Sequence, residues 1–122
     1  MNGKDILLDT NAVLYALSDL KYLKILKGYT LFISFITELE LLSYPSISDK
    51  DKRIIKKFIS KTTIFDVSEQ IKENTIYLRK KYKLKLPDAI ISATALSYNM
   101  VLMTNDKELF KLKDIEIKVL IE

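Results

Sequence analysis

Short apolar segments alternate with longer amphipathic segments along this chain of 122 residues. Ile6-Leu7-Leu8 and Val101-Leu102-Met103 contain no polar residue, which is typical of strands that are buried on both faces. Such strands occur where helices cover both sides of a parallel sheet, and each parallel pair needs a crossover connection. The alternation therefore predicts an α/β fold with a parallel sheet and right-handed crossovers.

Only two glycines and two prolines interrupt the sequence, so we expect mostly regular structure with short loops. The patterns indicate one domain over residues 1–122, in which Thr10 or Asn11 caps the first helix and Pro87 begins the last long one. The predicted strands cover 5–8, 30–34, 63–67, 100–104 and 115–121; the predicted helices cover about 11–19, 36–44, 50–60, 69–82 and 87–98, with a helical turn at 106–111.

Composition excludes several classes of protein. Hydrophobic residues make up 48% of the chain and charged residues 30%, which excludes a disordered protein. No apolar run is long enough for a transmembrane helix and no secretory signal is visible, so we expect a cytoplasmic protein without a membrane partner. The net charge is +4, with basic residues concentrated at 50–61 and 79–85, which suits a polyanionic partner or simply a solvated helix face.

Three aspartates stand where a predicted strand ends or a predicted helix begins: Asp9, Asp88 and Asp106. Ligand sites of α/β folds form at such places, so the three carboxylates are expected to meet. A fourth acid follows the second strand on its helix. Glu38 and Glu40 are both candidates there, and they lie about 200° apart around the helix, so only one can face the site. Because the chain lacks His and Cys, this oxygen-only set favours Mg²⁺ or Mn²⁺ over zinc.

Each acid also has a purely structural explanation. Asp88 suits the first turn of a helix and Asp106 suits an N-cap, whereas Asp9 follows three apolar residues and needs a partner. Without His or Cys, a Ser-His-Asp triad and a cysteine nucleophile are impossible, and no glycine-rich phosphate loop is present. A haloacid dehalogenase-type phosphatase needs a second aspartate where Asn11 stands, and a signalling receiver domain needs paired acids before its first helix.

The motifs resemble those of PIN-domain nucleases, and more narrowly those of VapC-type ribonuclease toxins. The matching segments, in order, are Leu7-Leu8-Asp9-Thr10-Asn11, Ile33-Ser34-Phe35-Ile36-Thr37 leading to Glu40-Leu41, Leu86-Pro87-Asp88-Ala89-Ile90-Ile91 with Ala93-Thr94-Ala95, and Thr104-Asn105-Asp106. The resemblance implies a three-layer fold whose sheet of about five parallel strands has the order 3-2-1-4-5. It also implies a catalytic quartet formed by Asp9, Glu40, Asp88 and Asp106. Three of these residues would bind the metal: Asp9, Asp88 and Asp106. Two polar residues would support the ligands: Asn11 and Thr104.

The function implied by the resemblance is that of an endoribonuclease dependent on Mg²⁺ or Mn²⁺, the toxin of a prokaryotic type II toxin–antitoxin pair. Its partners would be RNA, a VapB-like antitoxin and a second copy of the chain. Two alternatives stay open: a non-catalytic PIN-like module that binds RNA or protein, and an RNA-processing nuclease without an antitoxin.

Two surfaces are expected to serve these partners. An antitoxin would place an apolar segment near Leu14, Leu17 and Leu41 and a basic side chain on the acidic site. A homodimer would use some of the tyrosines Tyr15, Tyr22, Tyr29 and Tyr44.

Overall fold

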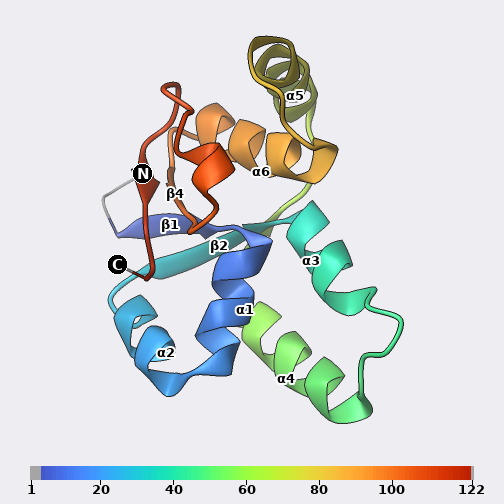
Figure 1. The fold of residues 1–122 in the computed structure, drawn as a ribbon. Coiled ribbons are helices and arrows are strands. Elements are labelled where there is room, and N and C mark those ends of the chain that lie inside the picture. Colours follow the sequence, from blue (N-terminus) through green and yellow to red (C-terminus); the bar gives the residue numbers. More distant parts are fainter. Residues whose placement is uncertain (1–3, 122) are drawn as a thin grey trace.

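A computed structural model describes residues 4–121 of the chain. Its strands are β1 (Asp5–Leu8), β2 (Thr30–Ser34), β3 (Thr63–Phe65), β4 (Val101–Met103) and β5 (Ile117–Lys118). All neighbouring strands pair in parallel, in the order β3-β2-β1-β4-β5 (Figure 1). The predicted parallel sheet and its strand order are therefore confirmed.

Helices cover both faces of this sheet. They are α1 (Thr10–Ser18), α2 (Leu20–Leu26), α3 (Phe35–Leu42), α4 (Asp49–Ile59), α5 (Glu69–Lys81) and α6 (Leu86–Ser97), with a 3₁₀ turn η1 (Lys107–Leu109). In Figure 1, α1, α2 and α4 lie on one side of the sheet and α5 and α6 on the other. Within residues 4–121, no helix is long and apolar enough to cross a membrane.

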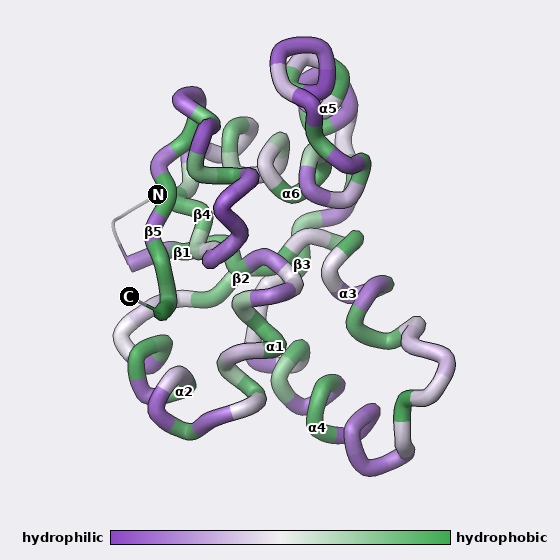
Figure 2. The backbone as a smooth tube through the Cα atoms, in the orientation of Figure 1, coloured by the Kyte–Doolittle hydropathy of each residue, from purple (hydrophilic) through white to green (hydrophobic). Residues whose placement is uncertain are grey.

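The side chains of β1 separate two apolar cores. Ile6 and Leu8 face the core that includes α1, α2 and α4, while Leu7 faces the core formed with α5 and α6. This alternation explains why the whole strand is apolar, since neither of its faces meets water. In Figure 2 the outer helix α5 is largely hydrophilic, whereas β2 and β4 are mainly hydrophobic. Between α5 and the sheet lies α6, with residues Ala89 and Ile91 to Ala95 all buried, as its apolar sequence predicted.

Four local features differ from the predictions. Helix α2 was not predicted, because only Leu26 of its seven residues is buried and its periodicity is correspondingly weak. The last strand pairs only over Ile117–Lys118 rather than 115–121, and the third strand ends at Phe65 rather than at residue 67. Asp9, not Thr10 or Asn11, is the N-cap of α1.

The sheet reverses its winding at β1, which lies between β2 and β4. Crossovers leave β1 toward β2 on one side and return to β4 on the other, so the connections diverge at the carboxyl ends of these strands. Such a switch point is where open α/β sheets bind ligands. The residues that directly follow β1 and β4 are Asp9 and Thr104, and β2 ends with Ser34.

Candidate active site

Asp9 is held at the switch point by two hydrogen bonds. It follows β1 directly and caps α1, with Oδ1 accepting the backbone N–H of Ala12 at 2.7 Å. Its other oxygen, Oδ2, accepts a hydrogen bond from the hydroxyl of Thr104. The side chain is buried, with 3% of its residue surface exposed. Each carboxylate oxygen has a second lone pair, so a capping aspartate can still serve as a ligand.

Thr104 links the ends of the two central strands. Its side chain is fully buried. The hydroxyl donates a hydrogen bond to Asp9, and its oxygen accepts one from the backbone N–H of Asp106 at 3.0 Å. One hydroxyl thus fixes the Asp9 carboxylate and the turn that carries Asp106. Asp106 is itself the N-cap of η1, with Oδ1 accepting the N–H of Glu108 at 3.0 Å.

Asp88 lies in the first turn of α6 and is half-buried. Burial raises the pKa of its carboxyl above the ordinary value of 3.8, and the negative charges of Asp106 and Glu40 raise it further. The positive charge of Lys85 opposes this increase. Residues from α3, α6 and the segment after β4 therefore share one electrostatic environment.

Glu40, rather than Glu38, faces this environment. Its Oε1 accepts a hydrogen bond from Thr10 Oγ1 at 2.7 Å, and Thr10 Oγ1 also lies 3.2 Å from the hydroxyl of Thr37. Thr10 follows Asp9 immediately, so the start of α1 orients the acid of α3. Sequence reasoning considered Thr10 only as a helix cap and missed this contact, because its partner lies 30 residues away.

The two asparagines of the motifs lie in different surroundings. Asn11, which was predicted to support the metal ligands, is exposed, and its side chain forms no hydrogen bond within residues 4–121, so its supporting role stays a prediction. Asn105 instead donates to the carbonyl of Ile121 at 2.7 Å and accepts the N–H groups of Leu120 and Ile121 at 3.0 and 3.1 Å. It therefore anchors the turn that leads to Asp106 onto the end of the chain.

The site concentrates negative charge in a buried place. Burial raises the pKa of Asp9 from 3.8 to about 6, the hydrogen bonds from Thr104 and Ala12 oppose that rise, and the charges of Asp88 and Asp106 add to it. Carboxylates that raise one another's pKa in this way are relieved by a bound cation.

The family model described as the PIN domain matches residues 6–115. The chain belongs to the PIN domain family. The matched region includes all four acids of the site, together with Thr10 and Thr104.

Several solved structures similar to this PIN domain are described as toxin–antitoxin complexes or VapBC proteins. A toxin–antitoxin complex from Klebsiella pneumoniae contains a chain that is 29% identical, with 96% of this chain and 98% of that chain covered and a TM-score of 0.82. A chain of VapBC-1 from nontypeable Haemophilus influenzae is 25% identical, with 97% of this chain and 99% of that chain covered and a TM-score of 0.83. A chain of VapBC2 from Rickettsia felis, bound to a promoter DNA fragment, is 25% identical, with 94% of this chain and 98% of that chain covered and a TM-score of 0.80. The comparison with curated protein sequences returned no match.

The donor set of this PIN domain fits a hard divalent cation in its chemistry. Asp9, Asp88, Asp106 and Glu40 supply only oxygen, and like charges in a buried place favour a cation. These carboxylates do not form a closed coordination sphere, because no three acidic side chains among residues 4–121 lie close enough together to hold a metal ion. Mg²⁺ keeps several waters and is usually held through only one or two carboxylates, so an open arrangement of this kind suits it.

Proposed function

We propose that this PIN domain is an endoribonuclease that depends on Mg²⁺ or Mn²⁺ and acts as the toxin of a VapBC-type toxin–antitoxin pair. The observation that carries the proposal is the buried carboxylate of Asp9 at the switch point, in the field of Asp88 and Asp106. PIN domains are generally nucleases, and the similarity to VapBC structures extends over almost the whole chain.

In this proposal, Asp9, Asp88 and Asp106 hold the ion, with Glu40 beside them. When bound, a divalent ion supplies a Lewis acid for water activation and a countercharge for the phosphate. Thr104 fixes the orientation of Asp9, and Thr10 fixes that of Glu40. The chain has no histidine, so hydrolysis relies on these placed oxygens rather than on an imidazole base.

RNA cleavage by charge-neutral variants tests the nuclease. Asp9→Asn, Asp88→Asn and Asp106→Asn each remove one carboxylate with almost no change in volume, and each should lower cleavage by two orders of magnitude or more. Glu40→Gln should also lower it, whereas the neighbouring Glu38→Gln should cleave like the wild type. Wild-type cleavage in excess EDTA, or full activity in all three aspartate variants, would overturn the metal site.

An apolar groove suits the predicted antitoxin. A hollow of about 520 Å³ is lined by Leu17, Leu20, Ile54 and Phe58 among others, and a second of about 380 Å³ shares Leu17 and Ile54 with it. These residues belong to α1, α2 and α4. Leu14 also lines the second hollow, as expected, but the prediction that Leu41 is available was wrong, because Leu41 is fully buried in the core. We assign this groove to an apolar segment of the antitoxin.

A basic side chain of the same antitoxin would enter the acidic site and compete with the metal there. Arginine suits this role best, because its guanidinium can bind two carboxylate oxygens at once. Co-expression with the neighbouring reading frame tests the pairing. Growth arrest caused by the PIN domain and relieved by its neighbour supports it, and arrest that the neighbour fails to relieve contradicts it without affecting the nuclease.

A non-catalytic module that binds RNA or protein is the second candidate. The observation in its favour is the lack of a ready cation site among residues 4–121. Metal-dependent cleavage decides between the two functions, because such a module would bind RNA equally well with and without metal. An RNA-processing nuclease without an antitoxin would instead cleave RNA and cause no arrest that a neighbouring gene relieves.

Two copies of the chain are proposed to form a two-fold dimer. Of the tyrosines considered for its interface, Tyr15 and Tyr44 are 43% and 47% exposed, while Tyr22 and Tyr29 pack against the core. Sedimentation at micromolar concentration tests the assembly, and a species of 14.2 kDa alone would contradict it.

A further inference from the structure

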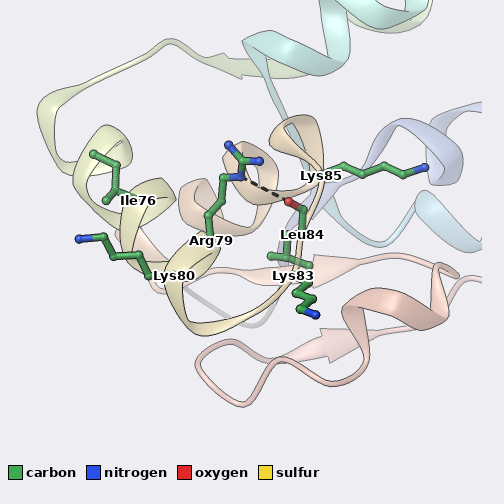
Figure 3. A pocket seen from close by; sticks show the side chains of 6 residues that line it. All are labelled: Ile76, Arg79, Lys80, Lys83, Leu84 and Lys85. Atoms are coloured by element: carbon green, nitrogen blue, oxygen red, sulfur yellow. Dashed lines mark hydrogen bonds between the residues drawn. The ribbon is translucent and has the colours of Figure 1, made fainter.

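A basic pocket lies at the junction of α5 and α6. It has a volume of about 710 Å³ and is lined by Ile76, Arg79, Lys80, Lys83, Leu84 and Lys85 (Figure 3). We call it the α5–α6 pocket. The two apolar residues form part of its wall, and four positive charges come from a stretch of only seven residues.

The four cations of the α5–α6 pocket have little direct compensation by acids, although the charge of Lys85 acts on the carboxyl of Asp88. Among residues 4–121, none of the four forms a salt bridge. Their neighbour Lys81 behaves differently: its Nζ lies 3.3 Å from Asp114 and 3.1 Å from the hydroxyl of Tyr77. Within residues 4–121, an acid therefore forms a salt bridge with Lys81 but with none of the four cations of the pocket.

Arg79 is preorganised within the pocket. Its Nε–H donates to the carbonyl of Leu84 at 3.3 Å, which fixes the guanidinium over the loop between the helices. The remaining guanidinium nitrogens are not used by other groups in the described part of the chain. A guanidinium held in this way presents a planar fork that matches phosphate oxygens.

The lysines of the pocket point in different directions. In Figure 3, Lys80, Lys83 and Lys85 extend away from one another, with Arg79 between them. A single small anion cannot contact all of these charges, whereas the successive phosphates of an extended strand can. The arrangement therefore favours a chain of phosphodiesters over a free phosphate.

One end of the pocket adjoins the acidic site. Lys85 is the N-cap residue of α6 and precedes Asp88 by three residues, in the segment that enters the helix. A strand that passes the carboxylates at this end of α6 can continue along the α5–α6 loop. Its backbone would then leave a negative, metal-binding region and enter a positive one.

We propose that the α5–α6 pocket binds the backbone phosphates of the RNA strand on one side of the scissile phosphate. This inference rests on the proposed function, because it assigns a place to the substrate of that reaction. The contacts are to phosphates, so they position the strand and do not select its bases. The pocket would give affinity and register, and the carboxylates would give the chemistry.

Binding of labelled single-stranded oligouridylate in EDTA, followed by fluorescence anisotropy, tests the pocket without requiring cleavage. Lys80→Gln with Lys83→Gln removes two charges that do not touch the acidic site. The double variant should bind roughly tenfold more weakly at low salt, and the slope of log affinity against log salt should fall by about 1.4, because each phosphate contact on a single strand contributes about 0.7.

The matched control is Lys21→Gln with Lys24→Gln. It removes the same charge from α2, on the opposite side of the sheet (Figure 1). The control should keep the wild-type salt slope and lose little affinity. An equal loss in both double variants would show that net charge alone attracts RNA, and unchanged binding in the pocket variant would also overturn the proposal. Thermal unfolding of both variants checks that they are folded.

Two further outcomes separate this inference from its alternatives. Polyglutamate of the same charge that competes as well as RNA would overturn the assignment to phosphodiesters and indicate an acidic protein segment instead. A wild type that binds RNA through the pocket but never cleaves it with Mg²⁺ would support the pocket and contradict the nuclease. A wild type that cleaves RNA while the pocket variant binds normally would do the reverse.

Discussion

The hydroxyl of Thr104 donates a hydrogen bond to the carboxylate of Asp9, across 95 residues of sequence. It joins the ends of β4 and β1, the two strands at which the sheet reverses its winding. The same oxygen accepts the N–H of Asp106, so one buried side chain relates two acids of the site to each other.

Replacing Thr104 by valine keeps the shape and removes this hydroxyl. The buried Asp9 oxygen and the Asp106 N–H would each lose a partner, which we expect to lower the free energy of unfolding by about 1–3 kcal/mol. Urea unfolding without metal at neutral pH measures the change. Thr104→Ser retains the hydroxyl and should lose less, and a valine variant as stable as the wild type would contradict the prediction.

The stability of the metal-free protein should fall as pH rises from about 4 to 6. Burial raises the pKa of Asp9 from 3.8 to about 6, so in this range the folded protein binds more protons than the unfolded chain. The stability linked to the protonated carboxyl is fully present below 3.8 and is lost as pH rises through about 6. The full change corresponds to about 3 kcal/mol as an upper figure. Unfolding titrations of Asp9→Asn should lack this slope, and a slope equal to that of the wild type would rule out Asp9 as its source.

Mg²⁺ or Mn²⁺ should stabilise the folded protein, and more so at pH 7.5 than at pH 5. A cation relieves the repulsion between Asp9, Asp88 and Asp106, but below the raised pKa of Asp9 it competes with a proton. A ligand at 100 times its dissociation constant contributes about 2.7 kcal/mol. Thermal unfolding with and without metal measures the effect, with Asp88→Asn as the variant in which it should shrink. Equal stabilisation of the wild type and Asp88→Asn at both pH values would count against the site.

Thr10 is expected to act through Glu40 as a positioning residue. Thr10→Val removes the 2.7 Å hydrogen bond to Glu40 and should reduce cleavage by about 10–100-fold, the usual cost of losing an outer partner of a metal site. RNA affinity in EDTA should not change. Thr10→Ser retains the hydroxyl and should recover most of the activity. A valine variant that needs no more Mg²⁺ than the wild type for half-maximal cleavage would show that Thr10 is merely structural.

Charge in the apolar groove should abolish antitoxin binding and spare the nuclease. Ile54 is 43% exposed and lines both hollows, so Ile54→Lys places a cation where an apolar segment is expected. Isothermal titration with the neighbouring gene product measures the loss. Val67→Lys changes an equally exposed apolar residue that lines neither hollow and serves as the control. Unimpaired binding by Ile54→Lys would place the antitoxin elsewhere.

The sequence by itself determined the architecture and the edge at which the acids stand. Ile6-Leu7-Leu8 was predicted to be a strand buried on both faces, because all three of its side chains are apolar, and Asp9 then had to lie at the carboxyl end of that strand. Asp88 follows Pro87 at a helix start in the same way. These inferences succeed because they depend on the chemistry of a few adjacent residues.

Tertiary structure alone decided which polar groups meet. The hydroxyl of Thr10, 30 residues away, donates to Glu40 and not to Glu38, and Asn105 forms hydrogen bonds with Leu120 and Ile121. Helix α2 was missed because it buries little, so its apolar pattern was too weak to detect. The sequence likewise could not tell which basic residues near the α5–α6 pocket form a salt bridge; in the structure Lys81 does so, with Asp114. Hydrogen bonds and ion pairs depend on distances across the fold, and periodicity along the chain does not encode those distances.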